Sequence, residues 1–252
     1  MVKAAKSKHG LRILVIDVGG THVKVLATGE REERKIVSGT TMTAARMVKD
    51  VKQVTSGWKY DVISIGYPGP AVQGRPLHEP CNLGKGWVGF HFSHAFGRPV
   101  KLVNDAAMQA LGSYRGGRML FLGLGTGLGS AMIVDGTLQP LELAHLPYKK
   151  GRTYEDYLGL RGLKRFGKKK WRRHVEDVVE RLKTALEPDY VVIGGGNLKK
   201  LKKLPPGAEP GDNRNAFRGG FRLWASDNSK VSVHAPKAPP AERARRDDGH
   251  GQ

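Results

Sequence analysis

The chain has a single cysteine, Cys81, among its 252 residues, and it has no long apolar run. A membrane span needs ~18 to 20 apolar residues, so none is predicted. One cysteine excludes an internal disulfide framework and any zinc site built from several cysteines, and it fits a reducing compartment. We therefore expect a cytoplasmic protein that is long enough to bury a sizeable core in two lobes.

Both ends of the chain lack hydrophobic periodicity. Residues 1–10 are basic, and residues 226–252 are polar with several prolines and arginines. We expect a disordered basic arm at 1–10 and a disordered tail at 226–252. The arm does not resemble a signal peptide, because it meets only a short apolar run and no small-residue cleavage site.

Acidic residues are scarce relative to basic ones. The 43 lysines and arginines against 23 acidic residues give a formal net charge of +20 at pH 7. The densest cluster is residues 161–173, called here the basic block, and a second cluster lies at 199–203. Such a field attracts polyanions, whether nucleic acid, an anionic membrane surface or polyphosphate. A generally basic, solvated surface would give the same composition, so both interpretations stay open.

Glycine, in contrast, is abundant in two turns that follow apolar strands. Residues 11–16 lead into Asp-Val-Gly-Gly-Thr-His-Val-Lys at 17–24, and residues 119–122 lead into Gly-Leu-Gly-Thr-Gly-Leu-Gly-Ser at 123–130. Glycine N–H groups can bind phosphate oxygens, and Asp17 is placed to hold magnesium or its water. Either turn alone could be an ordinary β-hairpin turn. The pair, with glycine at every other position in the second, favours two phosphate-binding loops.

The hydrophobic pattern predicts an α/β protein in which each half opens with such a turn. Strands are expected at 11–17, 22–28, 33–38, 62–65, 99–103, 119–122, 131–134 and 190–193. Helices are expected at 43–54, at 106–113 and over most of 154–187. Proline and glycine at 66–70 and three glycines at 194–196 mark loops directly after strands.

Seven ordered motifs resemble the ROK family of sugar kinases. They are 17–24, 66–69, Asn82 with Trp87, Asn104-Asp105, 125–129, 142–145 and 194–196. The resemblance spans about residues 11–225 and is nearest to the polyphosphate glucokinase branch, since residues 125–131 read Gly-Thr-Gly-Leu-Gly-Ser-Ala. It implies a two-lobed actin-like (ribonuclease H-like) fold, with lobes at 11–104 and 105–225 and the active site in the cleft between them.

The resemblance also implies a role for each motif. A sugar hydroxyl is a poor nucleophile, so a carboxylate must accept its proton, and Asp105 is the candidate base. The sugar-binding residues implied are Asn82, Asn104, Asp105, Glu142, His145 and Glu155. The phosphate- or nucleotide-binding residues implied are Asp17, Gly19, Gly20, Thr21, Lys24, Gly125, Thr126, Gly127, Gly194, Gly195 and Gly196. Asp105 could instead be a helix N-cap, and Glu155 could be a solvent-facing residue at a helix start.

Three departures from the family pattern narrow the prediction. Most ROK kinases hold zinc with one histidine and three cysteines, and this chain cannot, so no zinc site is expected and Mg²⁺, held by Asp17 through water, is the expected metal. Ala144 replaces the usual glycine of the sugar motif, which leaves the sugar open between glucose and another hexose. Ala107 stands where relatives often carry Asp or Asn.

The expected activity is phosphoryl transfer from polyphosphate, ATP or both to the 6-hydroxyl of glucose. The basic block is the expected polyphosphate track, through Lys164, Arg165, Lys168, Lys169, Lys170, Arg172 and Arg173. Alternatives are an ATP-only kinase for another hexose or amino sugar, and a non-catalytic ROK-type regulator. The ROK repressors carry an N-terminal helix-turn-helix, for which the sequence before residue 11 leaves no room, so nucleic acid is not an expected partner. A homodimer stays open.

Overall fold

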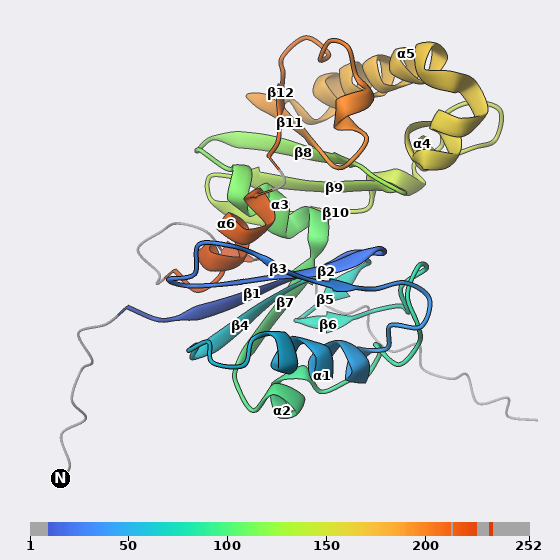
Figure 1. Ribbon diagram of the computed structural model, residues 1–252. Helices are drawn as coiled ribbons and strands as arrows, with labels where there is room; N and C mark the ends of the chain where they lie inside the picture. Colours follow the sequence, from blue (N-terminus) through green and yellow to red (C-terminus); the bar gives the residue numbers. More distant parts are fainter. Residues whose placement is uncertain (1–9, 213, 226–231, 234–252) are drawn as a thin grey trace, which may run out of the picture.

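The computed structural model describes residues 10–212, 214–225 and 232–233. Two sheets lie one above the other, with two helices between them (Figure 1). The first sheet has the strand order β3-β2-β1-β4-β7. Its strands are β1 (Ile13–Val18), β2 (His22–Ala27), β3 (Arg34–Val37), β4 (Val62–Tyr67) and β7 (Val100–Asn104).

The second sheet has the order β12-β11-β8-β9-β10-β13. Its strands are β8 (Arg118–Leu124), β9 (Leu128–Val134), β10 (Thr137–Leu141), β11 (Tyr190–Gly194), β12 (Ala208–Pro210) and β13 (Ser232–Val233). In the first sheet, β1 pairs antiparallel with β2 and parallel with β4. In the second, β8 pairs antiparallel with β9 and parallel with β11. Each half therefore opens with a hairpin around a glycine turn, as the sequence predicts.

The helices cover both outer faces and fill the space between the sheets. α1 (Ala44–Val54) and α2 (Phe92–Phe96) pack on the first sheet, and α4 (Tyr154–Leu158) and α5 (Leu160–Leu186) pack on the second. α3 (Asp105–Ser113) and α6 (Asn215–Arg222) lie between the sheets (Figure 1). A small hairpin, β5 (Ala71–Val72) with β6 (Arg75–Pro76), and two 3₁₀ turns, η1 (Leu143–His145) and η2 (Leu198–Lys200), complete the chain.

Alternation along β1 determines which side chains face the centre of the molecule. Successive side chains of a strand point to opposite faces. Leu14 and Ile16 belong to the core that α1 covers, whereas Ile13 and Val15 pack with α6. Asp17 continues the second series, so its carboxylate points toward the space between the two sheets.

α3 and α6 cross in direct backbone contact. A Cβ atom at Gly112 would overlap the backbone of Asn215, and one at Gly219 would overlap the carbonyl of Met108. Ser64 of β4 donates a hydrogen bond of 2.6 Å to the carbonyl of Gly220. α6 thus ties α3, and with it Asp105, to the first sheet.

Most predicted elements are confirmed, including the helix at 43–54 and the strands around both glycine turns. The predicted helical stretch at 154–187 divides into α4 and α5, and Gly167, with φ of 69°, interrupts α5. Within the tail expected to be disordered, Ser232 and Val233 instead form β13 beside β10. The rest of that tail, and residues 1–9 of the arm, lie outside the described residues. No helix in the described part of the chain is long and apolar enough to cross a membrane.

Candidate active site

The first glycine loop, residues 19–21, closes tightly on itself. The Gly19 N–H donates to the carbonyl of His22 at 3.0 Å, and Ser38 Oγ donates to the carbonyl of Gly19 at 2.7 Å. A Cβ atom on Gly20 would lie 3.2 Å from Cβ of Asn82. The structure therefore brings Asn82, a predicted sugar ligand, against the predicted phosphate loop. Because the Gly19 N–H is already bonded, any phosphate contact here falls to Gly20, Thr21 and their neighbours.

The second glycine loop, residues 125–129, is packed against the glycines at 194–196. Asn197 Nδ2 donates to the carbonyl of Gly125 at 2.8 Å, and the Gly125 N–H is bonded to Gly127 at 3.1 Å. On the other side, a Cβ atom at Gly129 would lie only 2.8 Å from Cβ of Ala106. Glycine at this position lets the loop approach the first turn of α3, which carries Asp105.

Asn104, and not Asp105, caps α3. Its Oδ1 accepts from the N–H groups of Ala106 and Ala107 at 2.8 and 3.2 Å, and its Nδ2 donates to the carbonyl of Gly69 at 3.0 Å. The alternative in which Asp105 is the N-cap is therefore wrong, because Asp105 is the first residue within the helix. The sugar contact predicted for Asn104 stays a prediction, since its oxygen already accepts two hydrogen bonds.

Asp105 lies in a group of carboxylates. Burial, together with the negative charges of Asp17 and Glu142, raises the pKa of Asp105 to about 7, against the opposing effect of the hydrogen bond from the Ala106 N–H. Burial also raises the pKa of Asp17, which Lys24 opposes. A base whose pKa is near neutral can take a proton and remain ionised at working pH. Asp17 and Asp105, from different halves of the chain, are thus near enough for the charge of one to act on the other.

A second group of charged side chains lies near Asp105 and consists of Glu142, His145 and Glu155. Burial raises the pKa of Glu142, and its carboxylate lies 4.0 Å from Nε2 of His145. Glu155 is close enough to raise that pKa further, and Glu155 Oε2 accepts from the Leu128 N–H at 3.3 Å. The alternative of a merely solvent-facing Glu155 is wrong, because this side chain rests on the second glycine loop.

His78 joins these residues without any signal in the sequence. Its charge acts to lower the pKa of Glu142, although it comes from the first half of the chain. Tyr67 fixes the His78 backbone by donating to its carbonyl at 2.7 Å. His78 and Glu142 come near each other only when the two halves of the chain pack together.

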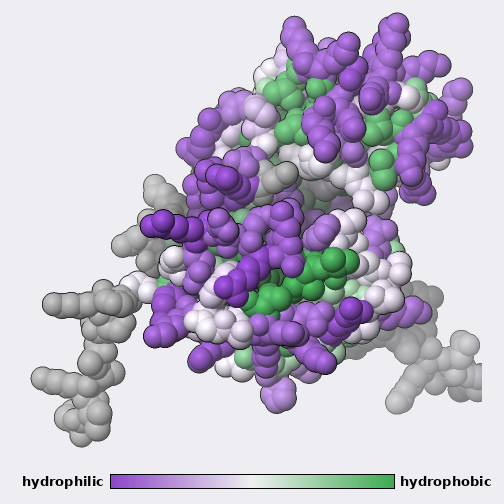
Figure 2. Space-filling view, viewed as in Figure 1, coloured by the Kyte–Doolittle hydropathy of each residue, from purple (hydrophilic) through white to green (hydrophobic). Residues whose placement is uncertain are grey.

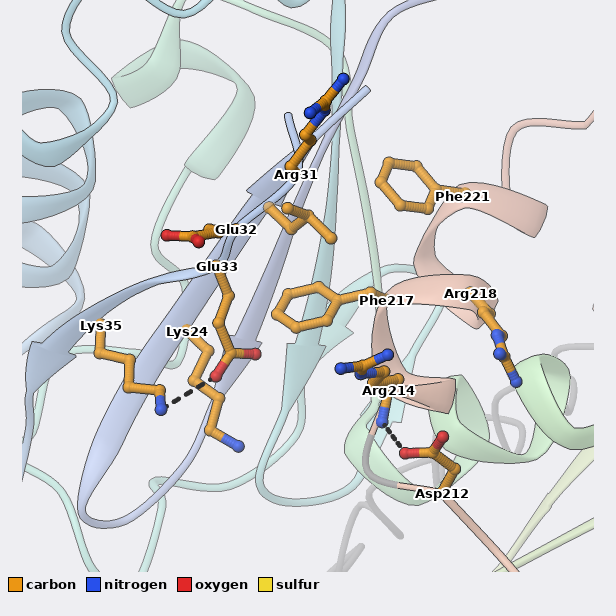
Figure 3. A pocket seen from close by; sticks show the side chains of 11 residues that line it. Lys24, Arg31, Glu32, Glu33, Lys35, Asp212, Arg214, Phe217, Arg218 and Phe221 are labelled. Atoms are coloured by element: carbon orange, nitrogen blue, oxygen red, sulfur yellow. Dashed lines mark hydrogen bonds and ion pairs between the residues drawn. The ribbon is translucent and has the colours of Figure 1, made fainter. Parts of the chain in front are cut away.

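Lys24 lies directly opposite Asp17 in the register of β1 and β2. It borders a cavity of about 800 Å³ between the β2–β3 hairpin and α6. Figure 3 shows Lys24 and Glu33 facing Arg214 and Phe217 across it. Glu33 pairs with Lys35 at 3.1 Å. The predicted phosphate ligand Lys24 therefore lies beside Asp17 in the sheet and also lines this cavity.

The basic block lies on α5 and begins beside the second glycine loop. The Leu160 N–H donates to the carbonyl of Thr126 at 3.0 Å, and Arg172 Nε donates to the carbonyl of Lys200 at 2.7 Å. The two basic clusters of the sequence are therefore neighbours, and hydrophilic side chains stand out over this part of the surface (Figure 2). Trp171, within the block, is fully buried and belongs to the core.

The carboxylate oxygens at the centre suit a hard divalent cation. Asp17 and Asp105 offer oxygen donors of the kind that Mg²⁺ prefers, and the charge of Asp17 disfavours the ionised form of Asp105. Among residues 10–212, 214–225 and 232–233, no three histidine, cysteine or acidic side chains are grouped as a ready metal site.

Comparison with known proteins agrees with this geometry. No protein-family model matches the chain. A polyphosphate glucokinase of Mycobacterium tuberculosis is 28% identical over 225 residues, which cover 81% of this chain and 83% of that protein. The solved structure of an inorganic polyphosphate/ATP-glucomannokinase from Arthrobacter sp. strain KM matches 85% of this chain and 98% of its own, with a TM-score of 0.72 and 23% identity.

A ROK-family transcriptional regulator also matches, with a TM-score of 0.67 and 17% identity over 85% of this chain and 77% of its own. The fold therefore does not by itself separate a kinase from a regulator. Together, the ordered motifs, the curated relative and the two-lobed actin-like fold confirm the resemblance of this chain to the ROK sugar kinases, nearest to their polyphosphate glucokinases.

Proposed function

We propose that this protein is a sugar kinase that transfers a phosphoryl group from polyphosphate, ATP or both to the 6-hydroxyl of glucose, giving glucose 6-phosphate. The observation that carries the proposal is Asp105, whose pKa burial raises to about 7 and which begins a helix pressed against the second glycine loop. The similarity to a polyphosphate glucokinase over most of both chains supports the choice of sugar and donor.

In this reaction the carboxylate of Asp105 takes the proton of the sugar hydroxyl as the oxygen attacks the terminal phosphorus. The bond from that phosphorus to the remaining donor phosphate breaks, and the donor leaves one phosphate shorter. Asn82, Glu142 and Glu155 surround the position of the sugar, whose hydroxyls can donate to the two carboxylates and can accept from the amide of Asn82. Positioning and charge neutralisation supply most of the rate in phosphoryl transfer.

We place Mg²⁺ at Asp17, held through water, where it would neutralise donor phosphate charge when bound. Two residues of the chain are arranged around this position. Asp17 points into the space between the sheets, and Lys24 lies opposite it. Gly20 and Thr21 of the first glycine loop, and Thr126 and Gly127 of the second, are the candidate phosphate-binding residues.

A second candidate is an ATP-only kinase for another hexose or amino sugar. The observation that favours it is Ala144, which is buried in the core of the second half between Glu142 and His145. Its methyl group occupies space that a glycine would leave empty, in a segment that carries two candidate sugar ligands. We also propose a cytoplasmic location, which the free, exposed thiol of Cys81 supports.

The decisive experiment measures glucose 6-phosphate production by purified protein with ATP or with long-chain polyphosphate. Mannose, N-acetylglucosamine and N-acetylmannosamine serve as alternative acceptors. The Asp105→Asn variant is the control for a contaminating kinase. Glucose phosphorylation that disappears in this variant supports the proposal, whereas activity with another sugar only would favour the second candidate. Absence of transfer to every sugar with both donors would leave the regulator as the better description.

A further inference from the structure

A second, smaller cavity lies between α5 and the turn that precedes α4. Residues 147–153, called here the basic hairpin, form this turn: Pro147 and Thr153 pair as an antiparallel bridge, and the Tyr148 N–H donates to the carbonyl of Arg152 at 2.7 Å. The cavity that it encloses against α5 has a volume of about 370 Å³. The sequence-based prediction of a polyphosphate track includes nothing from this hairpin.

Five cationic side chains from two separate segments line this cavity. They are Lys149, Lys150 and Arg152 of the basic hairpin with Arg165 and Lys170 of α5. Lys149 pairs with Asp177 at 3.0 Å. In the described part of the chain, no ion pair engages the other four, and no acidic residue lines the cavity. Four of the five cations therefore converge without an ion-pair partner among the described residues.

Aromatic rings form the remaining wall. Tyr157 and Phe166 stack with ring centroids 4.8 Å apart, and His174 meets Tyr157 edge-on at 4.7 Å. Burial and the neighbouring Lys149 lower the pKa of His174, so its ring is neutral at pH 7. Charges beside an apolar wall are screened less than charges in open water, which strengthens their attraction for an anion.

One short helix, α4, contacts both the second glycine loop and the cavity. On α4, Glu155 contacts Leu128 of that loop, and Tyr157, two residues later, lines the cavity. The next helix starts at Leu160, which is bonded to Thr126. An extended anion that leaves the loop along α4 would therefore come to the five cations of the hairpin and α5.

We propose that this basic cavity binds the distal phosphates of a long inorganic polyphosphate whose terminal phosphate occupies the active site. The inference rests on the proposed function and adds the residues that would distinguish a long phosphate chain from ATP. A flexible chain with charge on every unit can contact cations on two segments at once, whereas ATP carries its few phosphates near the glycine loops. Arg165 and Lys170 come from the predicted track, and Lys150 and Arg152 complete the site.

The test compares two double variants that remove the same charge. Lys150→Ser with Arg152→Ser changes the cavity lining, whereas Lys49→Ser with Lys52→Ser changes two exposed residues of α1 that do not line it. The first variant should raise KM for long-chain polyphosphate about tenfold, in line with two phosphate contacts, and lower its dependence on salt. KM for ATP and for tripolyphosphate should stay within about twofold, and the second variant should resemble the parent.

A binding measurement separates this site from the reaction. Polyphosphate added to the inactive Asp105→Asn protein should raise the pKa of His174, followed by NMR, because an anion in the cavity favours the charged imidazole. Equal KM changes in the two double variants, or an equal loss with ATP, would overturn the proposal while leaving the kinase activity in place. If the parent protein uses ATP alone as donor, and if polyphosphate leaves the pKa of His174 unchanged, then both the polyphosphate donor and this site are refuted. A His174 response to adenine nucleotides alone would assign the cavity to a nucleotide and overturn the inference.

Discussion

Replacement of Asp105 by Asn should stabilise the protein at alkaline pH while abolishing turnover. Burial raises the pKa of this carboxyl from 3.8 to about 7, so the folded state binds its proton more tightly than the unfolded chain does. The ionised form is therefore a cost to folding. The cost is absent below pH 4, grows as the pH rises toward 7, and is complete above it. Asn keeps an oxygen that can accept from the Ala106 N–H but carries no charge.

The size of the effect follows from the shift. Three pKa units correspond to about 4 kcal/mol, which is an upper limit because Asp105 retains some contact with solvent. Loss of a negative charge in the first turn of α3 subtracts about 0.3–1 kcal/mol. A net gain of about 1–2 kcal/mol should raise Tm by roughly 2–8 °C for a chain of this length. Over the same change, kcat should fall by at least about 10²-fold.

Thermal unfolding of both proteins at pH 4.5 and pH 8 measures this directly. The difference in Tm should be small at pH 4.5 and positive at pH 8. Asp61→Asn is a control of opposite sign, because hydrogen bonds from Arg12 lower the pKa of Asp61 to about 2. That charged form stabilises the fold above pH 4 and loses its contribution as the pH falls toward 2, so Asp61→Asn should lower Tm at pH 8. A Tm difference for Asp105→Asn that is negative, or independent of pH, would refute the reasoning from burial. A rise in Tm with normal kcat would refute the assignment of the base.

Three further predictions concern the same site. Glu142→Gln removes a negative charge that raises the pKa of Asp105, so the acidic limb of the kcat/KM profile against pH should move to lower pH; an unmoved limb would separate the two residues. Gly129→Val should displace Ala106 and α3, lowering kcat at least about tenfold in a protein that circular dichroism shows to be folded; unchanged kcat would show that the close approach is dispensable. Elemental analysis of tag-free protein should find no stoichiometric zinc, because Cys81 is the single cysteine; one zinc per chain would point to histidine and carboxylate ligands.

The features that could be predicted from the sequence are those with a local signature. Apolar strands next to glycine turns are encoded within a few residues, and both hairpins form where they were expected. The resemblance carried by the ordered motifs was enough to predict that Asp17 and Asp105 belong to one site. The charge of Asp17 contributes to the raised pKa of Asp105, although the two residues are far apart in the chain.

The features that escaped prediction depend on contacts between distant segments. α6 contains Gly219 and Gly220, and glycine disfavours a helix in isolation. Its packing against α3 explains both the helix and the need for glycine, and neither partner is visible in a short window. His78 likewise acquires significance only beside Glu142, and the basic hairpin looks like an ordinary polar loop until α5 encloses it.

The position of α6 also has a consequence for the order of events during synthesis. A nascent chain that has emerged only as far as β12 contains Asp17, Asp105 and both glycine loops, yet it lacks the helix that joins α3 to the first sheet. Domains generally fold as their last stabilising segment leaves the ribosome. The bond from Ser64 to Gly220 and the glycine crossing of α3 with α6 can form only then. Incomplete chains should therefore carry the phosphate loops without a positioned base, so that catalytic competence appears late and in a single step.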